Sequence, residues 1–266
     1  MSRSLPESSH ALLRAWPASA LALWTAAWRA GAVAPDDVLH TLHDYAQSHD
    51  VDAAPGAALS PGATALDLIR VVGDAAVSAV ALPAAGDAQG LPPGVFDDEV
   101  LGAGEVLLLA DADRAVTAVT ARGTIERCRW TVRPIEAMLD VEALGPEQGI
   151  GEIEYALRDA VGEAAAVIAG LSGPRSSGPA DLRDALAART RAGLLDLPPH
   201  DRPRVDRMLA TAAQIDAIVE LAGGGLGASA RQLEAADSEL RRLTGLTRRA
   251  RAAAINTLLR DYRRSA

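Results

Sequence analysis

The period of the hydrophobic pattern changes twice along this chain, and this change limits the folds that it can adopt. Residues 7–50 carry apolar side chains at helical spacing, residues 76–132 carry them in short runs, and helical spacing returns from Ile150 onward. Apolar positions three or four residues apart are typical of amphipathic helices, whereas short runs between turn residues are typical of strands. The sequence therefore predicts an α+β fold with N-terminal helices, a small antiparallel β-sheet and a C-terminal helical bundle.

The same pattern divides the chain into three regions. We predict an N-terminal helical element over residues 1–50, a small antiparallel sheet region over residues 62–145 and a C-terminal helical bundle over residues 150–266. Pro17 suits the first turn of a helix, and Gly31 suits the position just after its end. At 266 residues, the chain is long enough for one large or two modest hydrophobic cores.

Four runs in the middle region are predicted strands. They are Ala76–Leu82, Glu105–Ala110, Ala115–Ala121 and Arg127–Val132. The connections between the last three are too short to hold crossover helices, so we expect these strands to form an antiparallel meander.

Glycines punctuate the C-terminal region. Gly170–Pro179 is predicted to be a loop, and Gly223-Gly224-Gly225 is predicted to end a helix. Gly245 is expected to break or bend the segment that follows. A last helix is then predicted from Thr247 to about Arg263.

The chain contains no lysine, and all 26 of its positive side chains are arginine. Arg, Ala, Gly and Pro have GC-rich codons, so this composition indicates the codon bias of a high-GC genome. Arginine abundance by itself therefore does not indicate a function that needs guanidinium groups. The net charge of -9 argues against bulk attraction to nucleic acid or to anionic lipid.

Cysteine usage and the N-terminal apolar run bear on the cellular location. Cys128 is the only cysteine, which excludes an internal disulfide framework and a multi-cysteine metal site and favours the reducing cytoplasm. The apolar run Ala15–Trp28 is interrupted by Pro17 and followed by Arg29, as in a packed helix rather than a signal peptide. It is also shorter than the roughly 20 residues that span a bilayer, so no membrane partner is expected.

Four short motifs spaced along the chain occur in the same order as in a known family. They are the Trp-rich Ala helix followed by Ala34–Asp37, the run Leu82–Pro92, the helix start Gly151–Glu154 and the closing run Arg248–Asn256. The chain resembles, on these motifs, a family of uncharacterised proteins from high-GC actinobacteria, and the similarity spans most of its length. The resemblance implies the domain outline and an actinobacterial source. It implies no activity and no catalytic residue.

The last predicted strand has two contrasting faces. Alternation places Cys128, Trp130 and Val132 on one face, which is expected to be buried with an inert thiol. The other face carries a stripe of three arginines, Arg127, Arg129 and Arg133. This stripe could hold a phosphate or a carboxylate, or it could be a solvated face balanced by nearby acids.

A proline- and glycine-rich loop follows the first predicted strand. The loop Leu82–Gly94 contains Gly86 and Asp87, which we treat with the arginine stripe as candidate ligand-binding residues. Loops at strand ends commonly line ligand sites. A rigid structural loop is the alternative, and the glycine spacing does not match a phosphate-binding loop.

The C-terminus carries the strongest charge asymmetry. Residues 238–266 hold eight arginines and two acidic residues. On the last predicted helix, Arg249, Arg260 and Arg263 project from the face opposite the apolar stripe. They are the candidate partner-binding residues. Pairing with the acidic remainder of the chain is the alternative, and nucleic acid is disfavoured as a partner.

Signals for catalysis or metal binding are weak. His40 and His43 lie near Asp36 and Asp44 on one predicted helix, but no second ligand segment accompanies them, so no metal site is predicted. The motifs of serine hydrolases, zinc proteases and P-loop enzymes are absent from the sequence. No catalytic residue and no cofactor is therefore assigned, and the sequence favours a non-enzymatic role.

These observations rank three functions. The leading prediction is a cytoplasmic protein that acts through protein–protein interaction or self-association. The second is a small anionic-ligand-binding protein or enzyme that uses the sheet-edge loop. The third is a nucleic-acid accessory protein that acts through the Arg-rich C-terminal helix.

Overall fold

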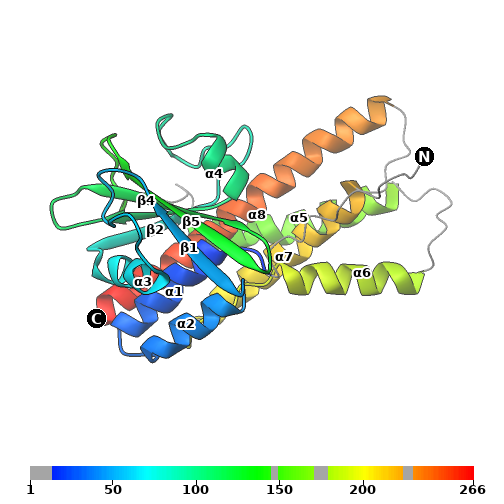
Figure 1. The fold of residues 1–266 in the computed structure, drawn as a ribbon. Coiled ribbons are helices and arrows are strands. Elements are labelled where there is room, and N and C mark those ends of the chain that lie inside the picture. Colours follow the sequence, from blue (N-terminus) through cyan, green and yellow to red (C-terminus); the bar gives the residue numbers. More distant parts are fainter. Residues whose placement is uncertain (1–13, 145–148, 171–178, 224–229) are drawn as a thin grey trace, which may run out of the picture.

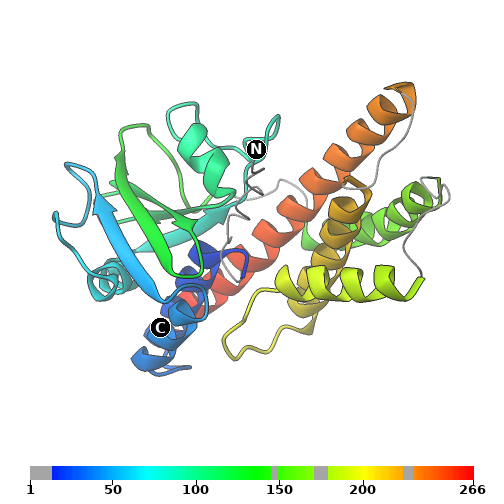
Figure 2. The same ribbon diagram turned by 45° about the vertical axis from the view of Figure 1, so that its right-hand side comes forward.

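The computed structural model describes residues 14–144, 149–170, 179–223 and 230–266 of the chain. Figure 1 shows a sheet with its covering helices on one side of the molecule and a group of longer helices on the other. The last helix runs through both parts, as the turned view in Figure 2 also shows. The predicted α+β class is confirmed.

The helices and strands follow one another as the change of hydrophobic period predicts, with additions. The helices are α1 (Pro17–Arg29), α2 (Pro35–His43), α3 (Ala65–Asp74), α4 (Asp98–Ala103), α5 (Ile150–Gly170), α6 (Pro179–Ala192), α7 (Pro203–Gly223) and α8 (Ala230–Ser265). The strands are β1 (Ser48–Ala53), β2 (Val77–Ala81), β3 (Val106–Ala110), β4 (Val116–Gly123) and β5 (Arg127–Ile135). Helices α4 and α6 and strand β1 are not among the predicted elements.

The five strands form one sheet in the order β1-β5-β4-β3-β2. Strands β2 to β5 pair antiparallel, so the predicted meander of β3, β4 and β5 is confirmed. Strand β1 adds a parallel pair with β5, which makes the sheet mixed. Its sequence, SHDVDA, is polar and only half-buried on alternate residues, so it carries little of the apolar signal by which strands are recognised.

We call the sheet with helices α1 to α4 the sheet half, and helices α5 to α7 the helical half. Helix α1 lies at the centre of the sheet half, against the sheet, α2, α3 and α8. Pro17 occupies its first turn, as predicted. At its other end, Gly31 adopts a φ of 73°, and the Ala32 amide donates to the Ala27 carbonyl at 2.9 Å. A left-handed glycine with this bond is the usual glycine stop of a helix, which satisfies carbonyls that would otherwise lack partners.

Helix α8 is continuous over 36 residues and passes through Gly245. Of the break or bend predicted at Gly245, the break is wrong, and the predicted separate last helix is the second half of α8. A mid-helix glycine costs about 1 kcal/mol relative to alanine, which tertiary packing readily offsets. Leu243 and Leu246 pack in the core of the helical half, whereas Ile255 and Leu258 pack in the core of the sheet half.

For the predicted loop Gly170–Pro179 and the predicted helix stop Gly223-Gly224-Gly225, the structure describes only the flanking residues. Helix α5 ends at Gly170 and α6 begins at Pro179, while residues 171–178 lie outside the described residues. Helix α7 is described up to Gly223, and residues 224–229 lie outside the described residues, so the predicted stop at Gly223-Gly224-Gly225 stays a prediction.

A single asparagine joins the last helix to the edge of the sheet. The Asn256 side chain accepts a hydrogen bond from the Val80 amide at 2.8 Å and donates one to the Val80 carbonyl at 2.9 Å. Asn256 is buried, and Val80 lies in the edge strand β2. The side-chain amide thus gives this edge strand the pair of hydrogen bonds that a further strand would supply.

The apolar face of β5 is buried as predicted. Cys128, Trp130 and Val132 are all fully enclosed, while Arg127 and Arg129 are exposed. Across the described residues, none of the helices combines the length and the apolar character needed to cross a membrane.

Candidate functional site

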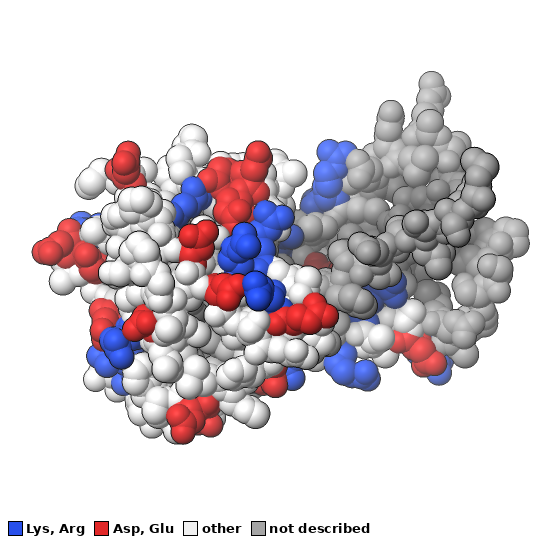
Figure 3. Space-filling model, in the orientation of Figure 1, with Lys and Arg blue, Asp and Glu red and all other residues white. Residues whose placement is uncertain are grey.

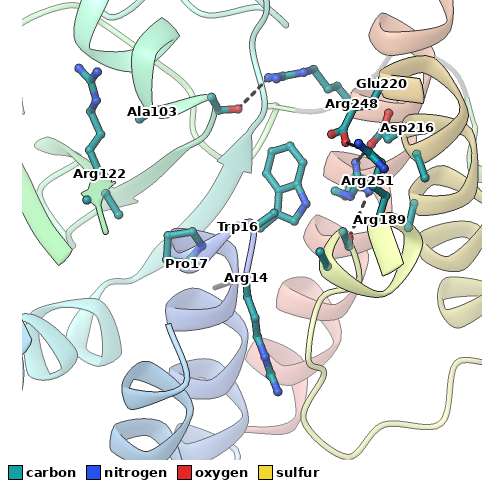
Figure 4. Close-up of a pocket in the computed structure, with 18 of the residues that line it drawn as sticks. Arg14, Trp16, Pro17, Ala103, Arg122, Arg189, Asp216, Glu220, Arg248 and Arg251 are labelled. Carbon is teal, nitrogen blue, oxygen red and sulfur yellow. Dashed lines mark hydrogen bonds and ion pairs between the residues drawn. The ribbon is translucent and has the colours of Figure 1, made fainter. Parts of the chain in front are cut away.

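A cavity of about 620 Å³ lies where the sheet half meets the helical half (Figure 4). We call it the cleft. Its lining comes from six segments that are distant in sequence: residues 14–17, 102–104, 121–124, 189–193, 213–220 and 248–251. Ligand sites in proteins commonly occupy cavities of about 300–1,000 Å³ at such junctions.

The cleft is basic although the protein is acidic. Among the described residues, five arginines line it: Arg14, Arg122, Arg189, Arg248 and Arg251. Two carboxylates, Asp216 and Glu220, share the lining. A concave site with an excess of guanidinium groups attracts anions, because its walls concentrate the electric field.

Trp16 stands between the two walls of the cleft (Figure 4). Its backbone is left-handed, with φ 71° and ψ 49°, an unusual conformation for a bulky residue. The guanidinium carbons of Arg251 and Arg248 lie 4.6 and 5.7 Å from the centre of its ring, within cation–π range. The indole Nε1 is buried and has no hydrogen-bond partner among the described residues. Strained backbone and unsatisfied donors gather at functional sites.

Arg251 holds the helical wall together. Its side chain is only 1% exposed, and its Nη1 donates to Asp216 Oδ2 at 2.6 Å. The other carboxylate oxygen of Asp216 accepts from the Thr247 hydroxyl at 2.5 Å. This buried pair joins α8 to α7, so the role of Arg251 is to fix the wall.

Arg248 bridges the cleft from α8 to the sheet half. Its Nη1 donates to the carbonyl oxygens of Pro83 at 2.7 Å and Gly104 at 2.9 Å. Burial lowers the pKa of the Arg248 guanidinium, although Asp216 acts in the opposite direction. Both of these bonds use one nitrogen of the group, which leaves its remaining donors for other acceptors.

Arg122 and Arg189 line opposite walls and are held loosely. The Nη1 of Arg122 lies 3.7 Å from Glu99 Oε2, and the Nε of Arg189 lies 3.7 Å from Glu220 Oε2. Their side chains are 54% and 44% exposed. Exposed pairs at this separation contribute little to stability, so both guanidinium groups can exchange partners.

A buried carboxylate supports the cleft from behind. Glu105 accepts hydrogen bonds from the Ala18 amide at 2.6 Å, the Ser19 amide at 3.0 Å and the Ser19 hydroxyl at 2.6 Å. It thereby satisfies the first turn of α1, next to Pro17 in the cleft lining. Burial raises the pKa of Glu105 to about 7, against the opposing influence of these bonds and of Arg251.

The predicted ligand-binding arginines lie on the outer face of the sheet, outside the cleft lining. Arg127 pairs with Asp50 at 3.3 Å, and Arg133 pairs with Asp97 at 2.5 Å. Arg129 is exposed and lies directly across from the cleft residue Arg122 in the β4–β5 register. Figure 3 shows positive and negative side chains interleaved on this face rather than one continuous basic patch.

The predicted ligand-binding loop is a compact turn. The backbones of Ala84 and Asp87 bond to each other, and Gly86 adopts a φ of 86° between them. The Gln89 side chain closes the loop by bonding both backbone groups of Leu82. Neither Gly86 nor Asp87 lines the cleft, although Pro83 in the same loop accepts the bond from Arg248 described above.

The predicted partner-binding arginines of α8 contact groups of the same chain. Arg249 lies 3.9 Å from Asp87, and Arg263 lies 2.6 Å from Glu142. The Nε of Arg260 donates to the Asn256 carbonyl, and its side chain is exposed.

The reactive-thiol and metal alternatives find no support in the geometry. Burial raises the pKa of the Cys128 thiol to about 12, so the thiolate is not populated near neutral pH. Among the described residues, no group of three or more His, Cys, Asp or Glu side chains is placed to hold a metal ion.

Sequence reasoning did not single out the residues that face one another in the cleft. Trp16 enters the sequence analysis only within the apolar run Ala15–Trp28, and Arg14, Arg122 and Arg189 carry no local motif. Arg248 and Arg251 appear in the sequence only as part of the basic C-terminus and of the closing run Arg248–Asn256 that carries the family resemblance. The Arg-Arg-Ala-Arg run of residues 248–251 is the one local signal that could have pointed to the site.

The chain matches two family models over most of its length. Residues 18–143 match the N-terminal domain of Rv1486c-like proteins, and residues 151–252 match the C-terminal domain of the same family. Together these ranges contain the sheet half and most of the helical half. No solved structure matches the chain.

The chain is also similar over most of its length to mycobacterial proteins that are named as uncharacterized. Rv1486c of Mycobacterium tuberculosis H37Rv is 29% identical over 288 aligned residues, which cover 91% of this chain and 97% of the relative. ML1804 of Mycobacterium leprae is 28% identical, with the same shares of the two chains covered. The actinobacterial resemblance read from the sequence is therefore confirmed, and the chain belongs to the Rv1486c-like family.

Proposed function

We propose that this protein binds a small anionic molecule in the cleft between its sheet half and its helical half. The observation that carries the proposal is the set of five arginines around a cavity of about 620 Å³ in a protein of net charge -9. Because the field inside a cavity is set by its own lining, a cavity rich in arginine attracts anions even in a protein of negative net charge.

The contacts of these arginines support binding rather than a purely structural role. Arg251 is buried and fully engaged with Asp216, whereas Arg122 and Arg189 are half-exposed and lie 3.7 Å from their carboxylates. Guanidinium groups form strong paired hydrogen bonds with phosphate and carboxylate groups. The indole ring of Trp16 adds an aromatic surface to the same cavity.

The first test is a thermal-shift titration with small anions at constant ionic strength. Anions that bind the folded state raise the melting temperature by mass action. We expect phosphate- or carboxylate-bearing compounds to raise it for the wild type and to lose this effect in Arg248→Gln. Arg70→Gln is the matched control, because Arg70 is an exposed arginine paired with Asp67 on α3, outside the cleft lining.

Two results would count against the proposal. The first is an anion effect that Arg248→Gln and Arg189→Gln leave as large as in the wild type. The second is the same loss of effect in Arg70→Gln as in the cleft variants, since this would reflect net charge rather than a site.

Protein–protein interaction through α8 is the second candidate function, and a cytoplasmic location goes with it. The exposure of Arg260, and of Arg249 beside a carboxylate 3.9 Å away, supports this reading, because such groups can turn to an acidic partner. Reversing Arg249, Arg260 and Arg263 to Glu is expected to abolish partner capture or self-association without unfolding the chain. Undiminished capture by a folded variant would reject it.

A further inference from the structure

We infer that the ligand of the cleft carries two separated anionic groups, one held by Arg122 on the sheet side and one held by Arg189 on the helical side. This inference rests on the proposed function and narrows the class of ligand. Arg122 extends from β4, and Arg189 lies in the last turn of α6. Figure 4 shows them on either side of Trp16.

Both arginines can leave their present carboxylates without stranding them. The Oε1 of Glu99 accepts from the hydroxyls of Thr120 at 3.2 Å and Thr131 at 3.4 Å, independently of the oxygen that faces Arg122. Glu220, the partner of Arg189, is 66% exposed and is solvated by water when Arg189 turns away. Exchanging each carboxylate for a ligand anion therefore leaves no buried charge unpaired.

The sheet-side subsite contains a like-charge conflict that an anion would relieve. Arg122 on β4 lies directly opposite Arg129 on β5. Like charges directly across two strands repel each other. A ligand anion between Arg122 and the cleft would offset this repulsion, which makes Arg122 a favoured position for negative charge.

The absence of a side chain at Gly102 leaves room for the sheet-side guanidinium of Arg122. A Cβ on Gly102 would lie 2.8 Å from the Nη1 of Arg122, so this guanidinium packs directly over the glycine backbone. The guanidinium of Arg122 therefore occupies the space that a side chain at position 102 would fill. Replacing Gly102 moves Arg122 without removing its charge.

The middle of the cleft suits an uncharged spacer. The indole ring of Trp16, which carries no charge, lies between the two walls. A single inorganic anion is far smaller than a cavity of about 620 Å³. A molecule of metabolite size with an anion at each end matches both the volume and the distribution of the arginines.

The experiment compares matched ligands by isothermal titration calorimetry. Suberate and octanoate have chains of equal length but carry two carboxylates and one, and pyrophosphate and phosphate extend the comparison to a compact dianionic group. We expect suberate to bind at least about tenfold more tightly than octanoate, as an added charge-assisted contact predicts. Arg122→Gln and Arg189→Gln should each reduce suberate to the affinity of octanoate, and Gly102→Ala should act in the same direction as Arg122→Gln.

The outcomes separate this inference from the proposed function. Equal binding of suberate and octanoate, with both lost in Arg248→Gln, would overturn the two-anion inference and leave anion binding in place. A suberate preference that survives both Arg122→Gln and Arg189→Gln would also overturn it. Wild-type protein that binds none of the four anions, and that shows no small-molecule adduct by native mass spectrometry, would overturn the proposed function as well.

Both arginines are exposed, so the variants are expected to fold, and circular dichroism provides the check. Arg70→Gln should retain the wild-type preference for suberate, because Arg70 pairs with Asp67 on α3. If pyrophosphate binds and suberate does not, the two anionic groups of the ligand lie close together, and the inference of two separated groups is overturned.

Discussion

The cleft rim and the buried seam behind it use the same kinds of polar side chain in opposite ways. The seam, where α1 and α8 pack on the sheet, contains Glu105 and Asn256, whose hydrogen bonds are 2.6–3.0 Å long and closed to solvent. The rim contains Arg122 and Arg189, each about half-exposed and 3.7 Å from its carboxylate.

The difference indicates that the seam determines the packing of the fold and that the rim is available for binding. A buried polar group is costly to leave unsatisfied, so its short bonds specify one packing of the helices on the sheet. An exposed pair at long distance adds little to stability and is free to meet another group. Substitutions in the seam should therefore change folding, and substitutions at the rim should change binding.

The largest expected effect is that of Glu105→Ala. The change leaves two amides and one hydroxyl at the start of α1 without an acceptor. We expect the free energy of unfolding to fall by about 4 kcal/mol, as measured by urea denaturation. A loss comparable to that of an exposed residue would show that the seam does not specify the packing.

The pH dependence of the same residue sharpens the comparison. The pKa of Glu105 is raised to about 7 from an ordinary value of 4.5, so between these pH values the folded state holds a proton that the unfolded state has released. Stability should fall as pH rises from about 4.5 to 7, by about 3 kcal/mol in total, and should then level off.

The Glu105→Gln variant isolates this effect from the other titrating groups. At each pH, the free energy of unfolding of Glu105→Gln is subtracted from that of the wild type. The difference should show the loss of stability with rising pH that we attribute to Glu105. A difference that stays constant from pH 4.5 to 7, or that rises, would contradict the raised pKa.

Asn256→Ala tests the seam at its other end. It removes both side-chain bonds to Val80 and leaves a buried amide and a buried carbonyl on β2 without partners. We expect a loss of about 2–3 kcal/mol in urea denaturation, together with faster amide hydrogen exchange in β2. Thr257→Ala, one residue away and bonded only within α8, is the control for helix propensity. Equal losses in the two variants would remove the special role of the asparagine.

Arg122→Gln should have the smallest effect on stability, under about 0.5 kcal/mol, because an exposed pair of this length contributes little. Chemical denaturation measures this directly. A large destabilisation would place Arg122 with the seam rather than the rim, and its proposed role in binding would need another explanation.

The sequence predicts the elements better than it predicts the site. The meander and the two faces of β5 follow from alternation, which is a local property of consecutive residues. Strand β1 was missed because SHDVDA is polar, and because its parallel partner β5 lies about eighty residues away in the chain. The bond that the Trp130 indole Nε1 donates to His49 Nδ1 joins these two distant segments. The break predicted at Gly245 considered only the local cost of glycine in a helix. The tertiary packing of α8, which offsets this cost, cannot be seen in the local sequence.

The cleft was not predictable for a related reason. Its arginines come from α6, α8, β4 and the segment before α1, and only the fold brings them together. In a chain whose every cation is arginine, each of them also lacks a compositional signal. Asn256 is the exception, since it is the only asparagine in the chain and its rarity could have marked it for attention.

The reach of α8 into the sheet half has a consequence for biosynthesis. The ribosome makes Val80 176 residues before it makes Asn256, which satisfies its backbone. During that interval the emerging β2 strand has an open edge, and exposed edges invite pairing with other chains. The N-terminal half is therefore open to wrong pairing at this edge until α8 has been made and Asn256 has bonded to Val80.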